Sequence, residues 1–89
     1  MLSIRRLNKF KKDIKTCQKR GYNMDLLKSV IATLAIPEQL EAKNRPHPLT
    51  GDYSSYEECH IAPDWLLIYQ QTENELVLVR TGTHSDLFR

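Results

Sequence analysis

Apolar residues in the first third of the chain repeat at helical spacing. From Leu7 to Cys17 they recur every three or four residues, which predicts an amphipathic helix that ends near Gly21. A second run with the same spacing follows Asn23, a good helix-capping residue, and continues to Ala35. The pattern therefore predicts two antiparallel helices joined by a tight turn.

The C-terminal half has the pattern of β-strands instead. Alternating or largely apolar segments are separated by turn residues such as Pro63 and Asp64. Leu2 and Ile4 also alternate with polar residues, which suits a short edge strand at the N-terminus. The predicted strands are residues 1–6, 56–61, 65–70 and 76–81.

A short helix is predicted at the C-terminus. Thr83 and Asp86 stand at the spacing of a capping box, with Asp in place of the usual Glu or Gln, so one helical turn should run through Leu87 and Phe88. The element order β-α-α-β-β-β-α groups helices and strands, which indicates an α+β fold with two helices packed on a mainly antiparallel, twisted sheet. A length of 89 residues suits a single domain over residues 1–89.

Residues 37–52 interrupt this order. The segment contains Pro37, Pro46, Pro48 and Gly51, which prevent long regular structure. Loops of more than about 12 residues in compact domains are commonly functional or mobile. This one carries His47, so we expect it to contribute to a site.

Charge is distributed unequally along the chain. The net charge is only +2, but residues 1–45 carry +7 and residues 46–89 carry −5. Most of the positive charge lies between Arg5 and Arg20, where Asp13 is the single acidic residue. Such a cluster is typical of a polyanion-binding surface, although a solvated helix face is the alternative. Four lysines of the first helix are the predicted RNA or ribosome contacts: Lys9, Lys11, Lys12 and Lys15.

Hydropathy and cysteine usage favour a cytoplasmic location. No apolar run approaches the roughly 20 residues that cross a bilayer, and the basic first 20 residues lack an uninterrupted apolar core for export. Cys17 and Cys59 lie within periodic apolar segments, so we expect reduced core residues. We expect a soluble protein without a membrane partner.

All three histidines lie in the second half of the chain, and each is next to a turn or a strand end: His47, His60 and His84. Two imidazoles suit phosphodiester transfer, because one can accept a proton from a ribose hydroxyl while the other protonates the leaving oxygen. Arg80 could balance charge on the non-bridging oxygens. This chemistry requires the 2′-hydroxyl of RNA.

Other interpretations apply to the same residues. The histidines could be loop residues or zinc ligands, but separations of 13 and 24 residues match no familiar ligand spacing, so no metal and no cofactor is expected. Asp64 could be only a turn former. Tyr56, Trp65 and Tyr69 suit packing better than base stacking, whereas Phe88, next to the last residue, suits a stacking surface.

Three ordered blocks carry a resemblance to a known family. They read H-P-L-T-G at residues 47–51, C-H-I-A-P-D-W-L-L-I-Y at residues 59–69 and R-T-G-T-H-S-D-L-F at residues 80–88. Together they resemble the YafQ branch of the RelE/ParE superfamily of bacterial toxins. The resemblance implies two helices on a twisted antiparallel sheet and cleavage of mRNA in the ribosomal A site. It also implies a cognate antitoxin, through which alone operator DNA would be contacted.

The resemblance also implies roles for individual residues. Five match the family's active-site positions: His47, His60, Asp64, His84 and Phe88. Arg80 matches its phosphate-contacting arginine. His84 is then the general acid, His60 helped by Asp64 the general base, and His47 a residue that binds or orients the phosphate.

One departure concerns the strand before the second histidine. Family members often carry a basic residue there, whereas this chain has Glu57 and Glu58, which should weaken phosphate attraction locally.

Two alternative functions remain open at this point. A non-catalytic member would bind RNA or act with its antitoxin as a DNA-binding repressor complex, and a gyrase-directed toxin of the ParE type would have no evident use for the histidines. The antitoxin is expected to cover either the basic face or the histidine cleft.

Overall fold

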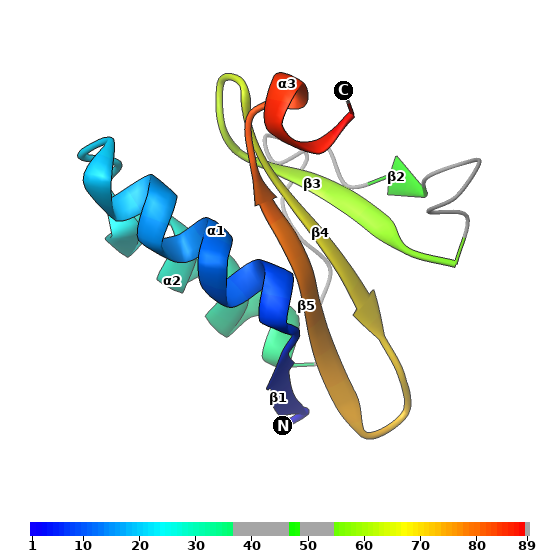
Figure 1. Cartoon of the computed structure of the whole chain (residues 1–89). Helices are drawn as coiled ribbons and strands as arrows, with labels where there is room; N and C mark the ends of the chain where they lie inside the picture. Colours follow the sequence, from blue (N-terminus) through cyan, green and yellow to red (C-terminus); the bar gives the residue numbers. More distant parts are fainter. Residues whose placement is uncertain (37–46, 49–54, 89) are drawn as a thin grey trace.

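The computed structural model describes residues 1–36, 47–48 and 55–88 (Figure 1). It has the predicted order of elements, with one short additional strand. The elements are β1 (Ser3–Arg6), α1 (Asn8–Lys19), α2 (Met24–Ala35), β2 (His47–Pro48), β3 (Glu57–Ala62), β4 (Trp65–Gln71), β5 (Glu75–Gly82) and α3 (His84–Leu87).

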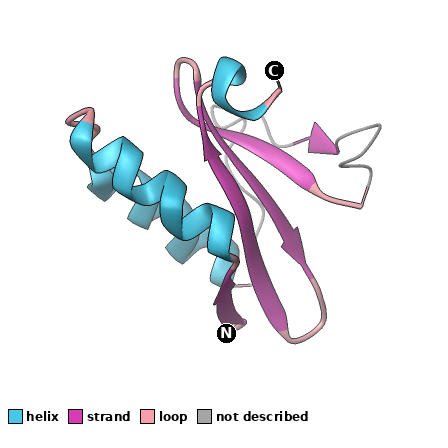
Figure 2. Cartoon of the chain, in the orientation of Figure 1, coloured by secondary structure: helices cyan, strands magenta, loops and turns pink. Residues whose placement is uncertain are grey.

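The strands form one twisted sheet in the order β1-β5-β4-β3-β2 (Figure 2). The β1–β5 pair is parallel and the other three pairs are antiparallel, which confirms the α+β class and the edge position of the first strand. The two-residue strand β2 was not predicted. It pairs His47 with Glu58 and Pro48 with Glu57. The rest of the predicted loop over residues 37–52 lies outside the described residues.

The boundaries of the first two helices follow local chemistry. Asn23 caps α2 as predicted, since its side chain accepts the Asp25 backbone N–H at 3.1 Å. Gly21, with φ +77°, lies in the turn between the helices, where a left-handed backbone favours glycine. The backbone N–H of Leu7, just before α1, donates to the Leu78 carbonyl of β5, which joins this helix to the sheet.

Alternation along the strands gives the sheet two different faces. One face packs against α1 and α2 in the main core, to which the helices contribute Phe10 and Leu27, and β4 contributes Leu67. The other face has a smaller buried cluster: Leu66, Ile68, Val77, Val79 and Leu87 of α3. The short C-terminal helix therefore belongs to the face of the sheet opposite α1 and α2.

The predicted roles of the cysteines and large aromatics are confirmed. Cys17 and Cys59 are free and buried, and burial raises the pKa of Cys59 to about 12. Trp65 and Tyr69 are buried in the main core. Within the described residues, no helix has the length and apolar character that crossing a membrane would require.

Candidate active site

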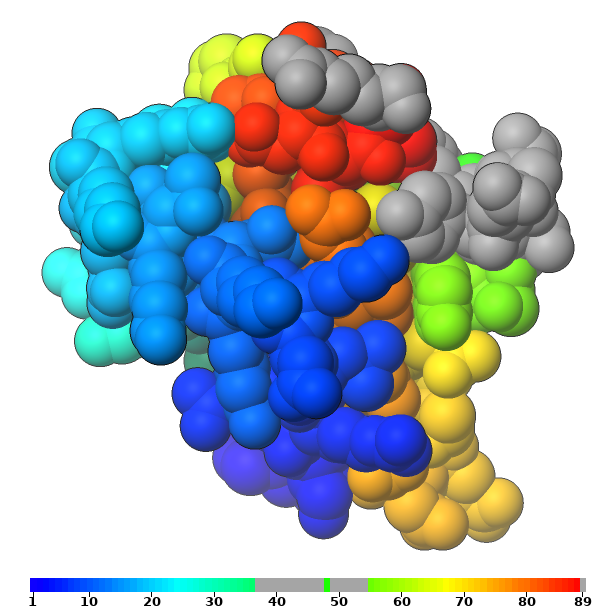
Figure 3. All heavy atoms as spheres, in the orientation of Figure 1, coloured from blue at the N-terminus to red at the C-terminus, as the bar shows by residue number. Residues whose placement is uncertain are grey.

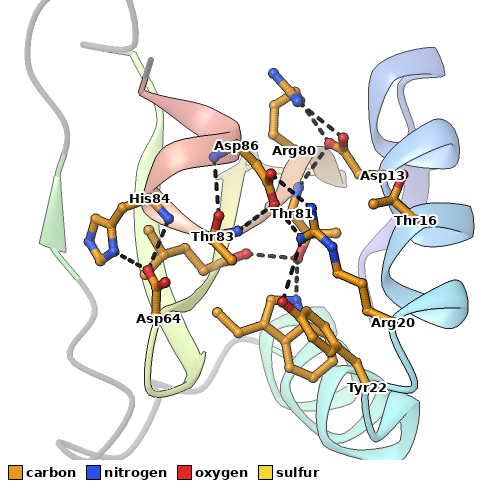
Figure 4. A network of polar contacts seen from close by, with 12 residues as sticks. Asp13, Thr16, Arg20, Tyr22, Asp64, Arg80, Thr81, Thr83, His84 and Asp86 are labelled. Carbon is orange, nitrogen blue, oxygen red and sulfur yellow. Dashed lines mark hydrogen bonds and ion pairs between the residues drawn. The ribbon is translucent and has the colours of Figure 1, made fainter.

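Asp64 and His84 form a short polar contact at the end of the sheet. Asp64 lies in the turn between β3 and β4 with φ +52°, a left-handed conformation that Asp tolerates better than most residues. Its Oδ1 accepts the His84 backbone N–H at 3.0 Å and lies 2.7 Å from His84 Nδ1 (Figure 4). Both side chains are more than half exposed. Asp64 therefore fixes the imidazole by one nitrogen and leaves Nε2 directed toward solvent.

The same contact sets the charge of Asp64. Hydrogen bonds from His84, first from its backbone N–H and then from its ring, hold the pKa of the Asp64 carboxyl below its usual value. A carboxylate that stays ionised is suited to receive the Nδ1–H of a neighbouring imidazole.

The predicted capping box caps the N-terminus of α3. The Thr83 hydroxyl accepts the Asp86 backbone N–H at 3.1 Å, and Asp86 Oδ2 accepts the Thr83 backbone N–H at 2.9 Å. Both bonds confirm that Asp can replace Glu at this position. Leu87 is buried under the helix. The single helical turn thereby presents His84 on the molecular surface.

The rings of His60 and Phe88 both lie near the ring of His84. The ring centroid of His84 is 6.2 Å from that of His60 and 6.3 Å from that of Phe88. Phe88 is 42% exposed, as expected for a stacking surface. The structure thus brings three predicted residues close to His84 of α3: His60 of β3, Asp64 of the β3–β4 turn and Phe88, which directly follows α3.

The carboxylates near His84 and His60 come from different residues. Asp64 Oδ1 contacts the ring of His84, and the predicted support of His60 by Asp64 stays a prediction. The carboxylate near His60 is that of Glu58, which is almost fully buried and has Oε1 4.0 Å from His60 Nε2. Glu58 follows Glu57 on β3, and alternation places it on the same face as His60.

His47 and Glu57 are placed differently. The backbone of His47 pairs with Glu58 at the sheet edge, but its side chain lies outside the described part of the structure. Glu57 Oε2 accepts a hydrogen bond from the Tyr69 hydroxyl at 3.1 Å. The predicted weakening of phosphate attraction by these glutamates stays a prediction.

Arg80 is paired with Asp13 of α1. Its Nε and Nη2 donate to the two carboxylate oxygens of Asp13 at 2.7 and 3.0 Å, and the Thr81 backbone N–H donates to the same carboxylate at 3.2 Å. The side chains of Arg80 and Asp13 are 19% and 15% exposed. The arginine predicted to contact phosphate is therefore held in a fixed orientation.

A second ion pair joins α1 to α3. Arg20, just after α1, donates to Asp86 Oδ2 at 2.6 Å and to Oδ1 at 3.0 Å. The Arg20 guanidinium, followed by the backbone N–H of Thr83, holds the pKa of the Asp86 carboxyl well below its usual value. Sequence reasoning had assigned Asp86 only to the capping box, and it had treated Asp13 and Arg20 only as parts of the charge pattern.

The four predicted lysines all lie on the exposed side of α1. Lys9, Lys11, Lys12 and Lys15 are exposed, while Phe10 and Cys17 of the same helix are buried. The space-filling view shows α1, in blue, on the surface beside the red C-terminal segment (Figure 3). The lysine-bearing helix and the C-terminal segment are thus both on the face seen in this view.

Among the described side chains, no group of three or more His, Cys, Asp or Glu residues is arranged to hold a metal ion. Two imidazoles with a carboxylate on one of them and an adjacent exposed aromatic ring are an arrangement capable of acid–base chemistry on a nucleic acid.

Comparison with known proteins identifies the family. The sequence model described as "Bacterial toxin of type II toxin-antitoxin system, YafQ" matches residues 2–89, so the chain belongs to the YafQ family of toxins. It is 42% identical over 82 residues to the mRNA interferase toxin YafQ of Escherichia coli K12, a match covering 89% of this chain and 87% of that protein.

Solved structures agree with this assignment. YafQ from E. coli BL21(DE3) superposes with a TM-score of 0.94 at 37% identity, with both chains fully covered. In the E. coli DinJ–YafQ toxin–antitoxin complex the match has a TM-score of 0.91 at 38% identity, covering 99% of this chain and 98% of that one. A metal-bound toxin from Helicobacter pylori matches with a TM-score of 0.91 at 46% identity, covering 99% and 100%.

Proposed function

We propose that this protein is an endoribonuclease that cleaves mRNA on the ribosome and thereby inhibits translation. The observation that carries the proposal is the pair of imidazoles, with ring centroids 6.2 Å apart, of which His84 is fixed by Asp64. Two titratable groups at this separation can act on opposite sides of one phosphodiester. Family membership and the mRNA interferase activity named for the E. coli relative support the same function.

His84 is the proposed general acid. When the ring is protonated, Nδ1–H donates to Asp64, and Nε2–H remains to protonate the 5′-oxygen as its bond to phosphorus breaks. Asp64 favours this orientation because it also binds the backbone N–H of the same residue.

His60 is the proposed general base. Its neutral ring accepts the proton of the 2′-hydroxyl, whose oxygen then bonds to phosphorus. The products are a 2′,3′-cyclic phosphate on one fragment and a 5′-hydroxyl on the other. Glu58, close to His60, can stabilise the charge that the ring gains. In this proposal Glu58, and not Asp64, is the carboxylate that supports His60.

The remaining site residues are proposed to bind the RNA. Arg80, oriented by Asp13, is proposed to balance charge on the phosphate, and exposed Phe88 to stack on a base. His47 is proposed to bind or orient the phosphate. The lysines Lys9, Lys11, Lys12 and Lys15 supply attraction for the RNA backbone or ribosome. The chemistry uses side chains alone, without a metal or cofactor.

The proposed partners are the ribosome with its mRNA and a cognate antitoxin. The E. coli relative YafQ forms a toxin–antitoxin complex with DinJ, and this chain belongs to a family of toxins from such systems. Contact with operator DNA is proposed to occur only through the antitoxin. Because mRNA and ribosomes are its targets, the proposed location is the cytoplasm.

Expression of the wild type and of His84→Ala tests this function. The wild type should arrest growth and cut mRNA at codon-linked positions, and His84→Ala should do neither at equal protein level. Growth arrest by the wild type with intact mRNA would show that the nuclease proposal is wrong. Purified folded His84→Ala protein that still binds ribosomes serves as the control.

A further inference from the structure

Two ion pairs connect α1 and its C-cap to the segment formed by β5 and α3, and α1 supplies the acidic partner of one while its C-cap supplies the basic partner of the other. Near the middle of α1, Asp13 binds Arg80 of β5, and seven residues later Arg20 binds Asp86 of α3 (Figure 4). Each pair has two hydrogen bonds of 3.0 Å or less. Paired bonds of this kind fix orientation as well as distance. The exposed basic helix is therefore tied to both segments that carry proposed site residues.

The Arg20–Asp86 pair acts on the first turn of α3. Asp86 Oδ2 accepts both Arg20 Nη1 at 2.6 Å and the Thr83 backbone N–H at 2.9 Å, so the ion pair and the capping box share one oxygen. Gly82 permits this approach, because a Cβ there would lie 2.8 Å from the same oxygen. A single helical turn has little stability of its own, and its placement depends on such contacts.

Polar side chains line much of the junction between α1, β5 and α3. A cavity of about 240 Å³ lies where α1 meets β5 and α3, and Asp13, Arg80, Ser85 and Asp86 are among its lining residues. Leu87 is the buried residue of α3. Polar contacts therefore act together with the burial of Leu87 to place α3 on the rest of the protein.

We propose that Arg20 is a positioning residue for the active site. By holding Asp86, Arg20 keeps α3 in the arrangement that sets His84 against Asp64 and His60, and it keeps Phe88 beside His84. This inference rests on the proposed ribonuclease function. It assigns Arg20, the cation that directly follows α1, a role in placing the catalytic histidine.

Steady-state cleavage of ribosome-bound mRNA separates positioning from charge attraction. Arg20→Met should lower kcat roughly 10- to 100-fold with KM nearly unchanged. Arg20→Lys keeps the charge but cannot make the paired bonds, so it should recover only part of kcat. Lys19→Met, the matched loss of an adjacent exposed cation, should leave kcat at the wild-type value. All variants are assayed well below their melting temperatures.

Two results of this assay would overturn the inference. One is an Arg20→Met variant with wild-type kcat. The other is a variant whose loss lies only in KM, which would show that Arg20 attracts RNA and does nothing more.

A double variant tests whether Arg20 acts through Asp86. Asp86→Asn keeps an oxygen for the Thr83 backbone N–H but loses the charge that binds Arg20. If the two residues act as one unit, Arg20→Met/Asp86→Asn should be no slower than the slower single variant. Losses in kcat that multiply would contradict the inference.

NMR of the histidine rings gives a readout that does not depend on catalysis. In the wild type, His84 should carry its proton on Nδ1 when neutral and show a cross-relaxation contact to Phe88. Arg20→Met should average the two tautomers and weaken that contact, whereas Lys19→Met should not. Unchanged spectra in Arg20→Met would overturn the inference about Arg20, whether or not the protein cleaves RNA. Absence of RNA cleavage by the wild type would instead refute the proposed function.

Discussion

The helix-covered face of the sheet and the surface formed by α3 and the β3–β4 turn differ in what holds their side chains. On the first, residues such as Leu67 and Phe10 are almost fully buried and are fixed by close packing. On the second, His84 and Asp64 are more than half exposed and are fixed by hydrogen bonds. Changes in the first region should therefore reduce stability, while changes in the second should reduce activity in a protein that remains folded.

The largest effect is expected from Leu67→Ala in the main core. Leu67 has no exposed surface, so the cavity left behind should lower the free energy of unfolding by about 2–5 kcal/mol. Cleavage per folded molecule should stay close to wild type. Urea unfolding together with an active-site titration checks both, and a large loss of activity per folded molecule would contradict the distinction between the core and the site.

Asp64→Asn should have the opposite effect. Asn accepts the left-handed conformation at this turn and can still bind the His84 backbone N–H, but it cannot stabilise a protonated ring by charge. We expect cleavage to fall roughly 10- to 100-fold with a melting temperature near wild type. Asp64→Gly is the matched control, because it keeps the turn and removes the carboxylate. It should cleave no faster than Asp64→Asn. Wild-type cleavage rates in both variants would show that Asp64 has no part in the mechanism.

Replacing Lys9, Lys11, Lys12 and Lys15 together by Gln should weaken binding to ribosomes or RNA and flatten its salt dependence. Each lost contact with single-stranded RNA lowers the slope of log affinity against log salt by roughly 0.7, or about 3 for four contacts. Lys28→Gln on α2 removes one exposed charge elsewhere and is the control. An unchanged slope between about 50 and 200 mM salt would exclude a backbone contact by this face.

The smallest effect concerns the acid stability of α3. The pKa of Asp86 is lowered in the folded protein, so its charged form adds stability above the ordinary pKa of about 4, and this stability is lost as pH falls through the lowered value. The wild type should exceed Asp86→Ala by about 1 kcal/mol at pH 7. Denaturant titrations should show the difference shrinking below about pH 4; a difference that grows there would contradict the assignment.

Local features of the fold were predictable from the sequence. Periodic apolar residues gave the two helices and the strands, Asn23 gave the start of α2, and Thr83 with Asp86 gave the capping box. These features depend on residues only a few positions apart, so their spacing is sufficient to predict them. The two-residue strand β2 lacks such a pattern and was missed.

The partners of the site residues were harder to predict. The Asp13–Arg80 and Arg20–Asp86 pairs join residues 67 and 66 positions apart, and the contact of Asp64 with His84 spans 20. The sequence shows the charged residues but not their pairing, because the pairing depends on how the fold brings α1, the β3–β4 turn and α3 together. Asp13, a lone acid within a basic segment, was a signal for a partly buried ion pair.

The most direct test of the account is single-turnover cleavage of ribosome-bound mRNA in which sulfur replaces the 5′ leaving oxygen at the cleavage site. Sulfur leaves without protonation, so this substrate bypasses a general acid. We predict that it restores cleavage to His84→Ala but not to His60→Ala, whose proton transfer occurs at the 2′-hydroxyl. Equal slowness of His84→Ala on the oxygen and sulfur substrates would contradict the assignment of His84 as the general acid.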